Sequence, residues 1–124
     1  MTQLSSLEMA VGTALAHQVS VDRPEALIEQ LKTAIVSGRD FTGIGFFTEF
    51  TVDKRLPPAA TIDRSPVGWV RCLVGPDAYP MEFMIYVRDG YAEMIEAYSF
   101  DDGYGDIDLL TTTFTTPAEV TPQT

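Results

Sequence analysis

The densest group of side chains that could bind a charged ligand lies towards the end of the sequence. Its members are Asp101, Asp102, Tyr104, Asp106 and Asp108. Carboxylates at this density can surround a hard cation such as Ca²⁺. The EF-hand spacing is absent, however, because the sixth position counted from Asp102 is Ile107 and the twelfth is Thr113. We therefore predict no metal site, and two interpretations stay open: a solvated turn, or an acidic contact surface for a basic protein partner.

Nucleophilic catalysis has few candidate residues in this chain. His17 is the only histidine and Cys72 the only cysteine. A Ser-His-Asp or Cys-His apparatus would need His17, which falls near the end of a predicted helix. Cys72 falls on the apolar side of a predicted strand, where a thiol is usually inert. Gly43 and Gly45 precede a strand instead of a helix N-terminus, so they do not form a phosphate-binding loop. We predict no cofactor.

Glu96 is the other carboxylate of interest, because the predicted strand register places it on an apolar face with Phe83, Met94 and Tyr98. A carboxylate in such a place either pairs with a donor or lies where the sheet edge meets solvent. We interpret it as an edge residue that reaches solvent or Arg39. A general acid in a pocket between helices and sheet is the alternative.

Aromatic and charged side chains alternate away from the predicted core faces of the strands. Trp69, Tyr86 and Glu93 are the residues of this kind that we select as candidate partner-binding residues, with Phe47 and Tyr91 beside them. Trp, Tyr and Arg are enriched at interface hot spots. Either this patch binds a protein partner, or it is covered by a helix or by a second copy of the chain in a homodimer.

These residues need two helices and a sheet to position them. Apolar residues at spacings of three and four predict a helix over 4–18, and Asp22 with Pro24 begins a second one over 23–37. After Gly38 the period becomes two, which predicts strands over 44–53, 67–74, 81–88, 91–99 and 107–114. Helices followed by strands favour an α+β fold, with two N-terminal helices packed on one face of an antiparallel sheet of about five strands.

The clearest local signal is Asp89-Gly90, which lies between two apolar and aromatic runs. Such a pair is typical of a two-residue type I′ hairpin turn. The turn predicts a register that pairs Val87 with Ala92 and Phe83 with Glu96.

Composition and charge set the class of protein. The chain has 124 residues, of which 45% are hydrophobic, and a net charge of −10. All 8 basic residues fall in 1–88, while 89–124 holds 8 acidic residues. A basic footprint for nucleic acid or anionic lipid is therefore missing. We predict a single domain over 1–114 and a flexible C-terminal tail over 115–124. The first six residues lack the charges of a signal peptide, and no apolar run approaches ~20 residues, so a cytoplasmic protein is expected.

Three stretches carry a resemblance. They are Gly38-Arg39-Asp40-Phe41-Thr42-Gly43-Ile44-Gly45-Phe46-Phe47-Thr48, Val87-Arg88-Asp89-Gly90-Tyr91, and Ile95-Glu96-Ala97-Tyr98-Ser99-Phe100 followed by acidic residues. The region from Ser37 to Asp108 resembles small uncharacterised bacterial domains with a hydrophobic-Glu-Gly-Tyr-Ser/Thr strand before an acidic turn. Some of these resemble immunity proteins of bacterial polymorphic-toxin systems. Here Ala97 replaces the glycine, and no Trp-Pro pair follows the turn.

Three functions are consistent with these observations. The first is a non-enzymatic acidic protein-binding module, such as an inhibitor that neutralises a basic toxin, because a strongly negative region speeds the encounter with a basic partner. The second is a small-molecule-binding or enzymatic pocket that uses Glu96 with Tyr98 or Tyr86. The third is a dimerising domain without a ligand.

Overall fold

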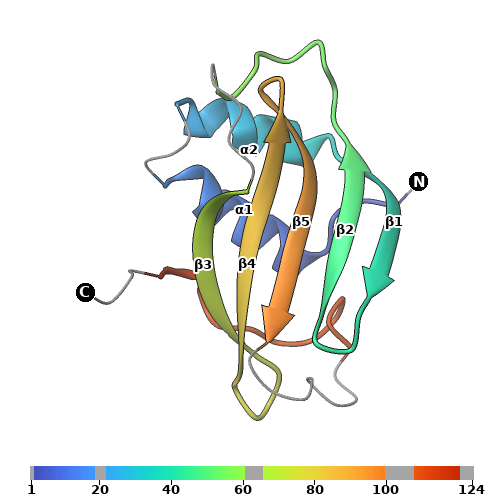
Figure 1. Ribbon diagram of the computed structural model, residues 1–124, viewed down its shortest axis with the longest axis vertical. Helices are drawn as coiled ribbons and strands as arrows, with labels where there is room; N and C mark the ends of the chain where they lie inside the picture. Colours follow the sequence, from blue (N-terminus) through green and yellow to red (C-terminus); the bar gives the residue numbers. More distant parts are fainter. Residues whose placement is uncertain (1, 19–21, 61–65, 100–107, 121–124) are drawn as a thin grey trace.

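The computed structural model describes residues 2–18, 22–60, 66–99 and 108–120 (Figure 1). Its elements are, in chain order, α1 (Ser6–Ala16), α2 (Pro24–Lys32), β1 (Ile35–Phe41), β2 (Gly45–Thr51), β3 (Val67–Val74), β4 (Tyr79–Arg88), β5 (Tyr91–Ser99) and the short β6 (Ala118–Glu119). The strands form one antiparallel sheet in the order β1-β2-β5-β4-β3-β6. The predicted α+β fold, with two N-terminal helices and an antiparallel sheet, is confirmed.

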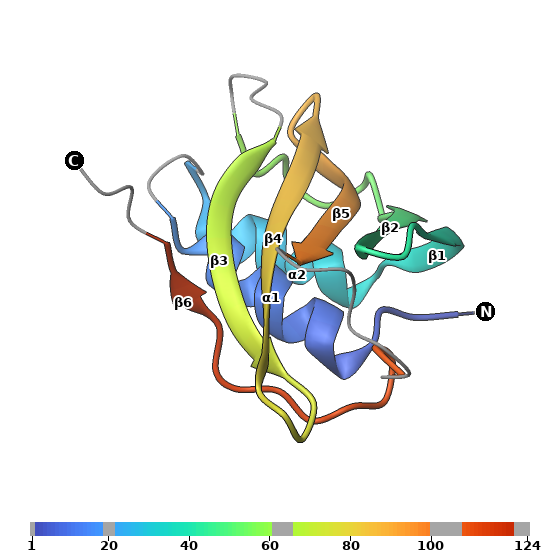
Figure 2. The ribbon, with the colours of Figure 1, turned by 60° about the horizontal axis from the view of Figure 1, so that its bottom comes forward.

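Both helices pack on the same face of the sheet. α1 contacts β3 and β4, α2 contacts β5, and the two helices contact each other behind the strands (Figures 1 and 2). α1 begins with a capping box, in which the Ser5 hydroxyl accepts a bond from the Glu8 amide and the Glu8 carboxylate accepts one from the Ser5 amide. α2 has Pro24 in its first turn, as predicted. None of the described helices is long and apolar enough to cross a membrane.

A single apolar layer lies between the helices and the sheet. Alternate residues of the central strands point into it, as expected for a sheet with one covered face. Its largest buried side chains are Leu7, Leu15, Leu27, Leu31, Phe46, Met81, Phe83, Ile85, Ile95 and Leu109. Burial of this apolar layer is the main favourable contribution to the free energy of folding. It also holds in place the strands that carry the side chains of the opposite sheet face.

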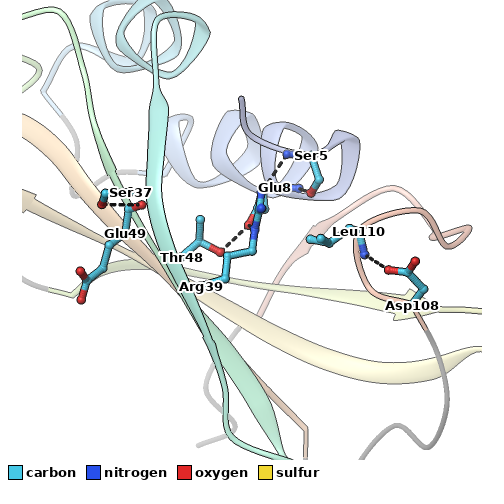
Figure 3. A network of polar contacts seen from close by, with 8 residues as sticks. All are labelled: Ser5, Glu8, Ser37, Arg39, Thr48, Glu49, Asp108 and Leu110. Atoms are coloured by element: carbon cyan, nitrogen blue, oxygen red, sulfur yellow. Dashed lines mark hydrogen bonds and ion pairs between the residues drawn. The ribbon is translucent and has the colours of Figure 1, made fainter. Parts of the chain in front are cut away.

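One buried ion pair fixes α1 to the first two strands (Figure 3). The carboxylate of Glu8 has no exposed surface and accepts bonds from Arg39 of β1, at 2.6 and 3.1 Å, and from the hydroxyl of Thr48 of β2. Burial alone raises the pKa of Glu8, but the bonds from Arg39, Ser5 and Thr48 outweigh burial and leave the pKa below its usual value. Because Arg39 is held here, the predicted contact between Glu96 and Arg39 is wrong.

The second helix is shorter than predicted, and a strand follows it. α2 ends at Lys32, and β1 begins at Ile35 within the segment expected to be helical up to residue 37. Ile35 and Val36 fit the apolar stripe of the helix, but they are β-branched and fit a strand as well. β1 is an edge strand that pairs only with β2, so it lacks the strict alternation of a half-buried strand.

The β4–β5 hairpin has the predicted turn but a different register. Asp89 and Gly90 both have positive φ, at 54° and 87°, as a type I′ turn requires. Val87 pairs with Ala92 as predicted, but a bulge follows, and Tyr86 pairs with Met94. Glu93 is the additional residue of this bulge. Every later residue of β5 is therefore shifted by one position relative to the predicted pairing.

This shift exchanges the two faces of β5. Phe83 pairs with Ala97, and Met84 pairs with Glu96. Ile95 and Ala97 consequently lie in the core, whereas Glu96 lies on the opposite face of the sheet. The predicted placement of Glu96 on an apolar face is wrong for this reason.

The C-terminal part also differs from the prediction. The sequence predicts a strand over 107–114. Over the described residues 108–114, the structure instead has a turn and a single bridge between Phe114 and Val74. Strand β6 lies instead in the segment expected to be a tail. The Thr115 amide bonds to the Leu73 carbonyl at 2.9 Å, and the Val120 amide bonds to the Trp69 carbonyl at 3.0 Å. These bonds connect residues 115–120 to the outer edge of β3.

Candidate functional site

The face of the sheet that points away from α1 and α2 carries the candidate site, and we call it the open face. Paired residues on neighbouring antiparallel strands share a face, so the register defines rows of side chains across it. The rows are Arg71-Glu82-Tyr98, then Met84-Glu96-Phe47, then Tyr86-Met94-Glu49. Trp69, Arg88, Glu93 and Asp40 also lie on it. Among the described residues, this face has five carboxylates and two guanidinium groups.

Glu82 is the centre of a hydrogen-bonded group that includes the only tryptophan. Its side chain has no exposed surface, although it lies on the open face. One carboxylate oxygen accepts bonds from Trp69 Nε1 at 2.5 Å and from the Tyr98 hydroxyl at 3.0 Å. The other accepts two bonds from Arg71, at 2.6 and 3.0 Å. These donors satisfy both carboxylate oxygens, so we interpret Glu82 as the residue that orients Trp69.

The neighbouring row contains a second tyrosine–carboxylate pair. The Tyr86 hydroxyl donates to Glu96 at 2.6 Å. This bond, together with partial burial and the charge of Glu96, raises the pKa of Tyr86 to about 12. In the Glu82 group, burial and then the bond to Glu82 raise the pKa of Tyr98 as well. Both phenols therefore remain protonated at neutral pH, and they act as hydrogen-bond donors that hold their rings in place.

A hollow of about 490 Å³ lies beside this pair on the open face. Its wall includes Glu49 of β2, Tyr86 and Arg88 of β4, and Glu93 and Met94 of β5. Arg88 Nε lies 3.4 Å from a carboxylate oxygen of Glu93, and both side chains are exposed. The bulge at Glu93 is what brings this carboxylate to the rim of the hollow.

Three of the predicted partner-binding residues come together on the open face. Trp69, Tyr86 and Glu93 all lie there, although they belong to three different strands. Tyr91 was expected beside them, but its hydroxyl donates to the carbonyl of Leu56 at 2.8 Å and so turns towards the loop after β2.

The acidic cluster is only partly described. Asp108 is exposed, and its carboxylate accepts a bond from the Leu110 amide at 3.0 Å (Figure 3). Asp101, Asp102, Tyr104 and Asp106 lie outside the described residues, so their predicted role in binding stays a prediction. In the described ranges, no three His, Cys, Asp or Glu side chains come together as a group that could hold a metal ion.

The only cysteine does not have the surroundings of a nucleophile. Cys72 is buried in the core, and burial raises the pKa of its thiol to about 12. His17 is exposed at the C-terminal end of α1. A thiol that stays protonated at neutral pH is a weak nucleophile, which agrees with the structural role expected for Cys72.

Sequence reasoning missed Glu82 and placed Tyr98 on the wrong face. Tyr98 was expected on the apolar face with Glu96, whereas it pairs directly with Glu82 on the open face. The burial of Glu82 depends on Arg71 and Trp69 from β3, and only the pairing of β3 with β4 brings these donors to it.

Comparisons of this chain with protein-family models, with curated proteins and with solved structures found no match. The open face itself is therefore the basis for assigning a function.

Proposed function

We propose that this protein is a non-enzymatic protein-binding module that binds a basic protein partner on its open face. The observation that carries this proposal is the combination of aromatic rings and carboxylates on a sheet face that neither helix covers. Phe47, Trp69, Tyr86 and Tyr98 supply the rings. Trp and Tyr are among the residues that dominate binding energy at protein interfaces.

Charge complementarity supports a basic partner. The described part of the open face has an excess of three negative charges, a count that includes Glu93 and Glu96, and the sequence from residue 89 onwards contains no basic residue. Opposite charge on the partner speeds association and excludes wrong partners. A basic protein therefore fits this face, whereas a second copy of the same face is repelled.

An inhibitor that neutralises a basic toxin is the specific form of this function that we favour. A nuclease, for example, presents basic side chains to nucleic-acid phosphates, and carboxylates of an inhibitor can take the place of those phosphates. The resemblance of residues 37–108 to immunity-protein-like domains supports the same proposal.

The geometry favours binding over catalysis. Glu96 was the candidate general acid, but the Tyr86 hydroxyl already bonds to it, and Glu96 is not among the residues that line the neighbouring hollow. Glu82 has donors on both oxygens. Among the described residues, hydrogen-bond donors thus already occupy both carboxylates, which supports a binding role for this face over catalysis.

The test is a capture experiment on lysate of the source organism, with the purified chain as bait. We expect a protein with a pI above that of the bait by several units, released by rising salt concentration, because charge-driven contacts are screened. A Trp69→Ala/Glu49→Gln variant should lose it. A Glu25→Gln variant, changed on the exposed surface of α2, should keep it.

Two results would contradict the proposal. One is a captured protein that is acidic, or that salt does not release. The other is a partner that binds the Trp69→Ala/Glu49→Gln variant as well as it binds the unchanged chain. A further variant with Asp101, Asp102, Asp106 and Asp108 all changed to Asn tests separately whether the acidic cluster contributes.

A further inference from the structure

The hollow on the open face is more specific than the face as a whole. Register places Glu49, Met94 and Tyr86 in one row across β2, β5 and β4. Neighbouring strands lie about 4.8 Å apart, so Glu49 and Tyr86 flank Met94 across about 10 Å. The flexible thioether side chain of Met94 therefore lies in the lining of the hollow, with a carboxylate on one side of it and a phenol ring on the other.

The carboxylates at the rim are not equivalent. Glu93 has Arg88 at 3.4 Å. Glu49 is exposed, and within the described ranges no donor is found for its carboxylate. The hollow thus combines two carboxylates with one guanidinium group, and a bound cation would balance the remaining negative charge.

The ring of Tyr86 is fixed in its position. Its hydroxyl bonds to Glu96 at 2.6 Å, so the phenol cannot turn away without losing a charge-assisted hydrogen bond. A rigid aromatic ring beside a carboxylate is the surrounding in which a guanidinium group binds well, because it stacks on the ring and donates two parallel bonds to the carboxylate.

We propose that this hollow receives one arginine side chain of the basic partner, with the guanidinium group at Glu49 and Tyr86 and the methylene groups over Met94. This inference rests on the proposed function and names the side chain that the open face recognises. Arginine fits better than lysine, since an ammonium group is more strongly hydrated and has no planar face to stack on the ring.

The experiment is a titration of the purified chain with n-butylguanidinium chloride, followed by the ¹H–¹³C methyl signal of Met94. That signal is assigned by its loss in a Met94→Leu variant. We expect a saturable shift in the millimolar range. n-Butylammonium chloride at the same ionic strength should bind at least fivefold more weakly. A Glu49→Gln variant should bind n-butylguanidinium at least fivefold more weakly, and Glu25→Gln should match the unchanged chain within twofold.

Three results would overturn the inference: a shift that stays linear with concentration, equal binding of the two cations, or an unchanged affinity in Glu49→Gln. Glu49 is exposed, so its variant is expected to fold, and a matching spectrum of the buried methyl groups checks this. If a basic partner is captured by the open face but n-butylguanidinium does not saturate, only the arginine site fails. If n-butylguanidinium binds as expected but no basic protein is captured, the proposed function fails.

Discussion

Changing Glu8 to glutamine should remove a large part of the stability of the domain. The carboxylate is fully buried, and Arg39, which donates two bonds to it, keeps only 13% of its side chain exposed. Glutamine keeps the shape of the side chain, but it loses the charge, and its amide nitrogen faces a donor. Breaking a buried ion pair by removing one partner costs about 3–5 kcal/mol. We expect about 3 kcal/mol, because the remaining exposure of Arg39 lets water recover part of this cost.

The assay is urea unfolding of a double-mutant cycle made of Glu8→Gln, Arg39→Gln and the variant with both changes. Urea unfolding gives the free energies of the cycle. In a separate thermal unfolding experiment, a loss of about 3 kcal/mol corresponds to a fall in Tm of roughly 10 °C in a domain of this size. The two single changes should be far from additive, with a coupling free energy above about 1 kcal/mol. Glu49→Gln is the control, since an exposed substitution usually changes stability by less than about 0.5 kcal/mol.

The same pair predicts a dependence on pH. The pKa of Glu8 is lower in the folded chain than its usual value of 4.5. A depressed pKa contributes stability that is present above the unfolded pKa and is lost as pH falls through the folded pKa. The difference in stability between the unchanged chain and Glu8→Gln should therefore shrink below about pH 4.5. A loss under 1 kcal/mol at pH 7, a coupling near zero, or a difference that grows in acid would refute this reasoning.

Three further changes test other contacts. Glu82→Ala should move the fluorescence of Trp69 to longer wavelength, because the indole loses its acceptor at 2.5 Å and becomes more exposed; an unchanged spectrum would contradict the orienting role. Gln30→Ala removes three hydrogen bonds to backbone groups from a fully buried amide, and urea unfolding should show a loss of about 2–4 kcal/mol. Gly45→Ala would bring its Cβ to 1.8 Å from a backbone oxygen, so thermal unfolding should show a clear loss. Gly38→Ala, which meets nothing within 4 Å, should show much less.

The parts of the fold that depend on residues close together in the sequence could be predicted. The Asp89-Gly90 turn and Pro24 in the first turn of α2 are determined by backbone preferences of the residues themselves. The strands β3, β4 and β5 have a covered face, so apolar residues recur along them with a period of two.

The edges of the sheet could not be predicted in the same way. β1 pairs on one side only and has little buried surface, and its first residues also complete the apolar stripe of α2. β6 has two residues, which is too short for any periodicity. β6 depends on its pairing with β3, which is distant in sequence, whereas β1 depends on its pairing with β2, the next strand along the chain.

The candidate site could be predicted only where it depends on the alternation of residues within one strand. Alternation placed Trp69 and Tyr86 away from the core, and the open face does carry them. The alternation of apolar and polar residues along a strand does not show which strands are neighbours. It therefore could not predict that Glu82 contacts donors from β3 and β5. A two-residue pattern cannot predict a bulge either, because a bulge interrupts the pattern at a single residue.

That bulge connects the fold to the proposed site. With Glu93 as an additional residue, Ile95 and Ala97 point into the core, and Glu96 and Tyr98 point to the open face. Deleting Glu93 removes the additional residue, so Met94 follows Ala92 directly and can pair with Tyr86 in a regular hairpin. Ile95 and Ala97 then keep their places in the core, and Glu96 and Tyr98 keep theirs on the open face. We expect the deletion variant and Glu93→Gly, which keeps the chain length and suits a bulge, both to unfold cooperatively in urea. A deletion variant that loses cooperative unfolding would show that the bulge itself, and not only the register beyond it, holds the open face together.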